Sequence, residues 1–259
     1  MGEKLLSGKQ PGWLVRLAQE IRIAFLYPER KNIEMKQIVF GLFLAALLVL
    51  PGTSSLGAET PRNFSVWEPE ISAFETSDAT NPPPRHGILF IGSSTIRFWT
   101  TLSQDFPGLP VINRGFGGSE ISDSTHFADR IIFPYAPRQI VFRAGGNDLA
   151  NGKSPEQVFA DYRAFIVLIE KVLPATTITY ISWNPTIARW LQRDKETELN
   201  RLIKNFTTGN PQLEYIDTAD LILGADGKPR ADLLRADKLH LNAAGYKLLA
   251  ERVRPYLRP

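Results

Sequence analysis

Two adjacent serines, Ser93 and Ser94, are the first residues whose position in this sequence suggests chemistry. They follow a run of apolar and small residues at positions 87–92, which is typical of a buried strand that ends in a turn. The sequence of residues 95–104 predicts a helix, so the serines are expected to lie between a parallel strand and the helix that follows it. Ligands of open α/β sheets bind at such carboxyl ends of strands. One of the two hydroxyls is therefore a candidate nucleophile.

Asp237 and His240 could supply the other groups that a serine nucleophile needs. A loop with this spacing can bring the carboxylate to one imidazole nitrogen while the other nitrogen faces a cleft, as in a serine triad. The other two histidines fit less well. His86 lies about 17–20 Å of extended chain before Ser94, and His126 falls among polar residues of a predicted helix. His240 is thus the candidate base, although a histidine before a helix can also be structural.

Two turns after predicted strands contain groups that could stabilise negative charge. Residues 113–119 (NRGFGGS) are rich in glycine, which lets backbone N–H groups point at an oxyanion, or else serves only a tight turn. Residues 145–148 (GGND) contain Asn147, whose amide could donate to an oxyanion or form part of a turn. Neither turn fits the glycine patterns of dinucleotide or phosphate binding.

Strands and helices alternate along the chain from residue 87. The predicted strands lie near residues 87–92, 110–114, 139–144, 177–183 and 213–216, and the predicted helices near 95–104, 119–130, 155–172, 191–206 and 243–257. This alternation predicts an α/β domain over residues 87–259 with a parallel sheet and helices on both faces. Residues 59–86 are expected to form a linker with a short helix that packs on the outside of the domain, at Trp67, Ile71 and Phe74.

Composition narrows the function classes. A chain of 259 residues with 43% hydrophobic content predicts one domain with a sizeable core. The absence of cysteine excludes disulfides, a cysteine nucleophile and a lipoprotein anchor, and with three histidines no catalytic metal or other cofactor is expected. Residues 1–36 hold seven Lys/Arg and four Asp/Glu, while the rest of the chain holds 23 of each. That balance gives no argument for a nucleic acid partner.

The N-terminal part has the pattern of a secretory signal over residues 35–58. A basic start is followed by 13 apolar residues at 38–50 and by small residues, with a cleavage site expected after Gly57 or Ala58. The apolar run is shorter than the roughly 20 residues of a spanning helix. We therefore expect export to the periplasm or the medium, with an uncleaved membrane anchor at 38–50 as the alternative. Residues 1–34 either precede a true start at Met35 or form a basic amphipathic helix at a membrane surface.

Four stretches together resemble the SGNH (GDSL-type) hydrolases in order and spacing: G-S-S at 92–94, N-R-G-F-G-G at 113–118, G-G-N-D at 145–148 and D-x-x-H at 237–240. The resemblance implies a three-layer α/β/α flavodoxin-like fold with a five-stranded parallel sheet. It also implies Ser94 as nucleophile, His240 as base, Asp237 as its partner, and an oxyanion hole of the Ser94 and Gly118 N–H groups and the Asn147 side chain. The sequence departs from the family at Ser93, where an aspartate is usual.

The expected function is hydrolysis of carboxylic esters through an acyl-enzyme, with small acyl or acetyl esters, including those on glycans, as substrates. An O-acyltransferase of the cell envelope would use the same residues, the family also includes lysophospholipases and thioesterases, and the fold could carry a non-enzymatic binder. Trp99 and Trp183 could form walls of the cleft, although aromatic residues at such positions are often core residues. Membrane association is expected, if at all, only through the N-terminal segment.

Overall fold

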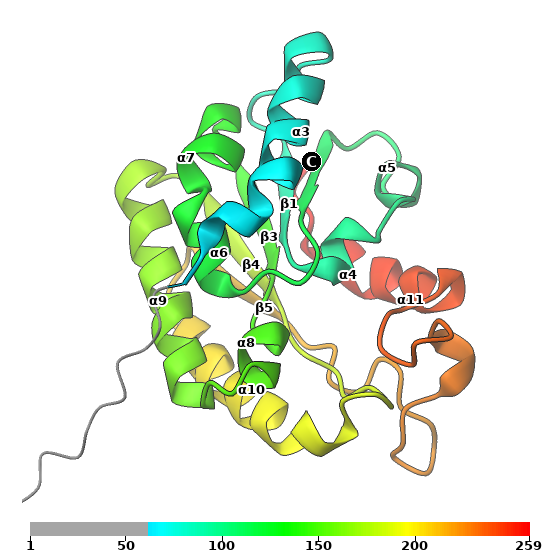
Figure 1. Cartoon of the computed structure of the whole chain (residues 1–259). Coiled ribbons are helices and arrows are strands. Elements are labelled where there is room, and N and C mark those ends of the chain that lie inside the picture. Colours follow the sequence, from blue (N-terminus) through cyan, green and yellow to red (C-terminus); the bar gives the residue numbers. More distant parts are fainter. Residues whose placement is uncertain (1–61) are drawn as a thin grey trace, which may run out of the picture. The chain divides into compact units, whose positions relative to one another are not determined.

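Five parallel strands form one sheet in the order β2-β1-β3-β4-β5 in the computed structural model, which describes residues 62–259 (Figure 1). The strands are β1 (Ile88–Gly92), β2 (Val111–Gly115), β3 (Gln139–Arg143), β4 (Thr177–Ile181) and β5 (Leu213–Ile216). Every residue of β1, β3 and β4 is buried, as expected for central strands covered on both faces. This strand order is the flavodoxin-like one, and it confirms the predicted fold class.

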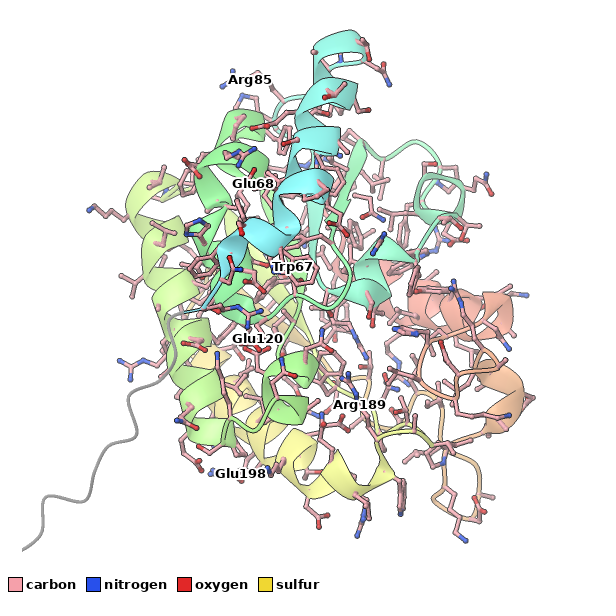
Figure 2. The ribbon with its side chains drawn as sticks, in the orientation of Figure 1. Trp67, Glu68, Arg85, Glu120, Arg189 and Glu198 are labelled. Carbon is pink, nitrogen blue, oxygen red and sulfur yellow. The ribbon has the colours of Figure 1, made fainter. Side chains whose placement is uncertain are left out.

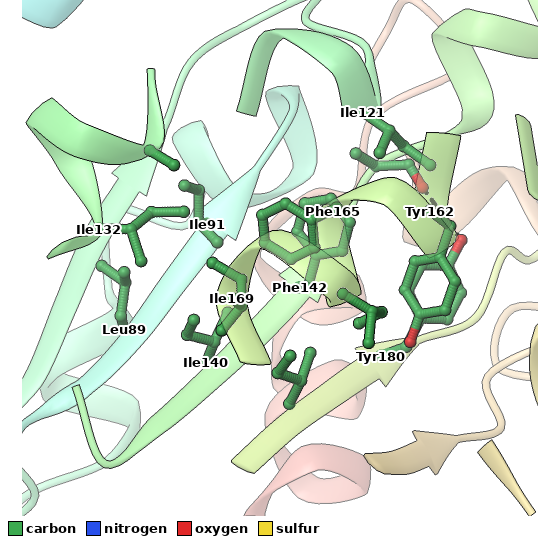
Figure 3. Packing of buried hydrophobic residues seen from close by; sticks show 14 of the residues in the cluster. Leu89, Ile91, Ile121, Ile132, Ile140, Phe142, Tyr162, Phe165, Ile169 and Tyr180 are labelled. Carbon is green, nitrogen blue, oxygen red and sulfur yellow. Dashed lines mark hydrogen bonds between the residues drawn. The ribbon is translucent and has the colours of Figure 1, made fainter. Parts of the chain in front are cut away.

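Helices cover both faces of the sheet, and their bounds are α3 (Glu68–Thr80), α4 (Ser94–Arg97), α5 (Leu102–Asp105), α6 (Ile121–His126), α7 (Ala128–Ile131), α8 (Gly146–Ala150), α9 (Pro155–Val172), α10 (Arg193–Thr207) and α11 (Ala243–Val253). One core cluster joins the sheet to α6, α7, α9 and α10, and Phe142 stacks there on Phe165 at 4.3 Å (Figure 3). The second cluster packs α4, α5 and α11 against the opposite face.

The strand register brings the predicted turns to one edge. Gly92 at the end of β1 is aligned with Gly115 of β2 and with Arg143 of β3. The chain therefore leaves these three strands at the same level, and the turns that contain Ser94, Gly118 and Asn147 start side by side.

Several predicted helices are shorter than expected. Residues 95–104 form α4 and α5 with a break between them, and there the Asn113 side chain donates to the carbonyls of Ile96 and Trp99, which also accept from the N–H groups of Trp99 and Leu102. The last helix ends at Val253 and continues as a 3₁₀ turn, because Pro255 has no N–H for a further helical hydrogen bond. The capping box of Ser154 and Gln157 starts α9 as predicted.

The segment before the sheet contains a 3₁₀ turn (Phe64–Trp67) followed by α3, which lies along the outside of the domain (Figure 1). Ile71 is its one buried residue, and Arg130 of α7 binds the carboxylates of Glu68 and Glu75. Trp67 packs edge-on against Phe116 with 5.7 Å between ring centroids, so this segment touches the glycine-rich turn.

The predictions for residues 1–34 and for the signal or anchor at 35–58 lie outside the described residues. Within residues 62–259, no helix combines the length and the apolar character that a membrane span requires.

Candidate active site

Ser94, His240 and Asp237 form a chain of hydrogen bonds. The Ser94 Oγ lies 2.9 Å from His240 Nε2, and His240 Nδ1 lies 2.7 Å from Asp237 Oδ2. The sequence predicted these three residues as partners, and the fold brings them together although 146 positions separate Ser94 from His240. His240 bonds to Ser94 and not to Ser93, whose backbone N–H donates to the Arg143 carbonyl.

The turn before Ser94 depends on Gly92. Its φ is +139°, and a Cβ at this position would lie 2.0 Å from the Arg143 carbonyl oxygen, so no larger residue fits. Ser93 then adopts an extended conformation and Ser94 becomes the first residue of α4. This arrangement ends the strand abruptly and holds the Ser94 hydroxyl at the sheet edge.

The Asp237 carboxylate is fixed by its own loop. Its Oδ1 accepts hydrogen bonds from the N–H groups of Leu239 and His240, at 2.9 and 3.0 Å. Lys238, between Asp237 and Leu239, has a φ of +58°, and its carbonyl accepts from the N–H of Ala188 in the loop after β4. Hydrogen bonds from His240 hold the pKa of Asp237 well below its usual range, so the carboxylate stays ionised beside the imidazole.

The Asn147 amide is held from two sides. Its Nδ2 donates to the Ser119 carbonyl at 3.0 Å, and its Oδ1 accepts from Arg189 Nη2 at 2.8 Å. Arg189 also donates to the Gly146 carbonyl, and Figure 2 shows this side chain next to α8. These bonds fix the orientation of the amide and leave one Nδ2 hydrogen free for a ligand.

Gly118 lies one residue before Ser119 and adopts a φ of +85°, with Trp67 packed against it. Within residues 62–259, the N–H groups of Ser94 and Gly118 make no hydrogen bond. Among the described residues, these two backbone N–H groups and one hydrogen of the Asn147 amide are therefore unpaired, and they lie in the turns that follow β1, β2 and β3.

A cavity of about 30 Å³ lies directly beside Ser94. Asn147 and His240 line it together with residues that the loop after β4 contributes. The full lining consists of Ser93, Ser94, Thr95, Arg143, Asn147, Trp183, Asn184, Thr186, Arg189, Glu196, Leu239, His240 and Leu241.

The two tryptophans expected at the cleft lie in different places. Trp183 lines the cavity, donates from Nε1 to the Ala144 carbonyl and has the Arg143 guanidinium 4.7 Å above its ring. Trp99 does not line the cavity: it is 1% exposed, packs in the core against Phe90 and bonds to Asp105. The prediction for Trp99 was wrong because its large ring is buried in the core cluster with α4, α5 and α11.

The other two histidines lie away from the site. His86 precedes β1 and is exposed, at the opposite end of the strand from Ser94. The ring of His126, at the end of α6, stacks on Phe64 at 3.9 Å between centroids. Both positions agree with the assignment of His240 as the histidine of the site.

Sequence reasoning missed several polar residues of the cavity. Glu196 lies on the same face of α10 as the buried Leu199 and Ile203, so a carboxylate within an apolar stripe was the signal that could have revealed it. Arg143 ends a strand whose other residues are also buried. Arg189 and Thr186 lie in a loop without a regular pattern, and the sequence contains no such signal for them.

The sequence of this domain matches one known family model. Residues 92–248 match the sequence model of a family described as GDSL-like lipase/acylhydrolase, which is more than half of the chain. No curated protein sequence matches the chain.

Solved structures resemble the chain at low sequence identity. A Streptococcus pneumonia protein provisionally described as a platelet activating factor is 19% identical, with a TM-score of 0.67, over 88% of this chain and 100% of its own. A GDSL-like lipase from Bacteroides thetaiotaomicron is 16% identical with a TM-score of 0.60, over 72% and 96%. An acetylxylan esterase from Geobacillus stearothermophilus, in a catalytic mutant, is 15% identical with a TM-score of 0.54, over 66% and 94%. At these identities the likeness shows the fold.

Proposed function

The chain belongs to the GDSL-like lipase/acylhydrolase family and is a hydrolase that acts on ester bonds, and we propose that it cleaves small carboxylic esters through an acyl-enzyme on Ser94. The chain of hydrogen bonds from Ser94 through His240 to Asp237 carries this proposal. A serine hydroxyl becomes an effective nucleophile only when a base accepts its proton, and His240 Nε2, which lies 2.9 Å from Ser94 Oγ, supports this role.

The reaction proceeds in two halves. His240 Nε2 takes the Ser94 proton as Oγ attacks the ester carbonyl, and Asp237 stabilises the imidazolium and fixes its tautomer. The tetrahedral intermediate then loses the alcohol, which leaves with the proton from His240, and an ester on Ser94 remains. A water molecule, deprotonated by His240, attacks this acyl group and releases the acid and the free serine.

The oxyanion of the tetrahedral intermediate is stabilised by the Asn147 side chain and by the free N–H groups of Ser94 and Gly118. Asn147→Ala should lower kcat by about 10²–10³, because one donor is lost where the charge develops. Asn205→Ala, a change at an exposed position of α10 where the side chain makes no hydrogen bond within residues 62–259, should retain the wild-type rate. Steady-state kinetics with thermal unfolding test this, and a folded Asn147→Ala enzyme at full rate would exclude the role.

The cavity beside Ser94 supports a short acyl group. About 30 Å³ admits one small group of the ester, about the size of methyl or hydroxymethyl, next to the carbonyl that Ser94 attacks. Its walls contain the buried Arg143 and Glu196, against which an alkyl chain would gain little. Acetyl esters of carbohydrates meet these limits, and the acetylxylan esterase with the same fold acts on a substrate of that kind.

Activated esters of one alcohol, with acyl chains of two to sixteen carbons, test this substrate range. We expect kcat/KM to be highest for acetyl and to fall from four carbons upward, because longer chains exceed the cavity. A maximum at eight or more carbons would instead indicate a lipase or lysophospholipase. Absence of turnover for every chain length would contradict ester hydrolysis itself.

A further inference from the structure

The cavity beside Ser94 is lined by three buried polar side chains that each have an unpaired atom. Arg143, Thr186 and Glu196 are 2%, 8% and 3% exposed. Within the described part of the chain, no group pairs with Arg143 Nε, Thr186 Oγ1 or Glu196 Oε2. Buried polar atoms in proteins are nearly always hydrogen-bonded, so three unpaired atoms on side chains that line one cavity point to a polar ligand there.

The other polar atoms of Arg143 and Glu196 form hydrogen bonds within the protein. The unpaired atoms are therefore the ones that can bind a ligand. Arg143 donates from Nη1 to the Ser182 carbonyl and from Nη2 to Asn184 Oδ1, at 2.6 and 2.7 Å. Glu196 Oε1 accepts from Gln192 at 3.2 Å. Within residues 62–259, the atoms without any partner are the Arg143 Nε–H, the Thr186 hydroxyl and Glu196 Oε2, and Arg143 Nη2 keeps one further N–H.

We propose that this cavity binds a hydroxyl group of the ester substrate, next to the carbonyl that Ser94 attacks. A hydroxyl can accept from Arg143 Nε and donate to Glu196, while Thr186 adjusts to either role. An ammonium group would meet the Arg143 charge, and a second carboxylate would meet Glu196. A purely alkyl group would leave all three atoms unpaired. The proposal rests on the proposed esterase function.

The size of the cavity and the charge state of its walls agree with this ligand. About 30 Å³ accommodates a group of the size of hydroxymethyl. Burial raises the pKa of Glu196 to about 7, so near neutral pH this side chain can accept or donate. Burial also lowers the pKa of Arg143 to about 10, which leaves it cationic at that pH.

The hydroxyl could belong to the acyl part or to the alcohol part of the ester, and two isosteric pairs distinguish these sources. Glycolyl and propionyl esters of the same alcohol differ only by OH for CH₃ in the acyl group. 2-Hydroxyethyl acetate and propyl acetate differ in the same way in the alcohol. For each pair, kcat/KM is measured and the hydroxyl-to-methyl ratio is compared between wild type and variants, so that intrinsic reactivity cancels.

Thr186→Val and Glu196→Met remove one unpaired polar atom each at nearly constant volume. Thr197→Val and Glu198→Met make the same changes on α10 outside the cavity. We expect the ratio for one of the two pairs to fall by roughly three- to tenfold in both cavity variants and to remain constant in both controls. Thermal unfolding identifies any variant that fails to fold. If one cavity variant does not fold, the ratio measured for the other cavity variant tests the proposal.

Two results separate this inference from the proposed function. The wild type could hydrolyse acetyl esters while neither cavity variant changes the hydroxyl-to-methyl ratio of kcat/KM. This result would overturn the hydroxyl site and leave the proposed esterase function intact. No hydrolysis of any of the four esters by the wild type would overturn the proposed function.

Discussion

Ser94→Ala should lower kcat by about 10⁶-fold and leave the fold intact. The substitution removes the proposed nucleophile, while the hydrogen bond between His240 and Asp237 does not involve this side chain. The hydroxyl bonds to His240 alone among the described residues, so its loss removes one hydrogen bond to a partly exposed imidazole. Ester hydrolysis measured beside thermal unfolding gives both quantities for one sample.

Ser93→Ala is the matched control for this prediction. Ser93 precedes α4, but its side chain makes no capping hydrogen bond, and its neighbour is the serine that bonds to His240. We expect Ser93→Ala to react with an organophosphonate ester and Ser94→Ala to remain unlabelled, as seen by intact mass. Labelling of Ser94→Ala but not of Ser93→Ala would reverse the assignment of the nucleophile.

Asp237→Asn should lower kcat by about 10³–10⁴ with a small effect on KM. An asparagine amide can present its NH₂ to His240 Nδ1, which favours the imidazole tautomer that cannot accept the Ser94 proton. It also lacks the charge that stabilises the imidazolium. The Asp237 side chain is 47% exposed, so water replaces part of the lost interaction and the lower end of this range is attainable.

Asp232→Asn provides the comparison for Asp237→Asn. Asp232 lies in the same stretch before α11 and is exposed, and among the residues that the structure describes its carboxylate pairs with Arg230 alone, so its substitution should change kcat less than twofold. Because the pKa of Asp237 is held well below its usual range, the wild-type rate should not follow titration of this carboxyl above pH 4. Equal rates for Asp237→Asn and wild type across pH 5–9 would contradict its role.

The α/β fold was predictable because each element has a local physical cause. The apolar residues of β1 form a strand that only a sheet covered on both faces can bury. Ser154 and Gln157 cap α9 through atoms three positions apart. Helix breaks were less predictable, since the one after α4 involves a hydrogen bond from Asn113, 14 positions after Trp99. Trp99 was placed at the cleft, whereas its large ring belongs to the core.

By itself, the sequence determined which residues could perform the chemistry: a serine at the end of a buried strand, a glycine-rich turn, an asparagine and an Asp-x-x-His pair. These depend on residue type and on spacing along the chain, which a sequence states directly. Only the tertiary structure decided that Ser94 rather than Ser93 meets His240. It alone showed that Arg189 orients Asn147 from 42 positions away and that Arg143, Thr186 and Glu196 enclose a polar cavity. Those contacts arise where separate loops converge above the sheet, and no local pattern encodes which side chains face one another there.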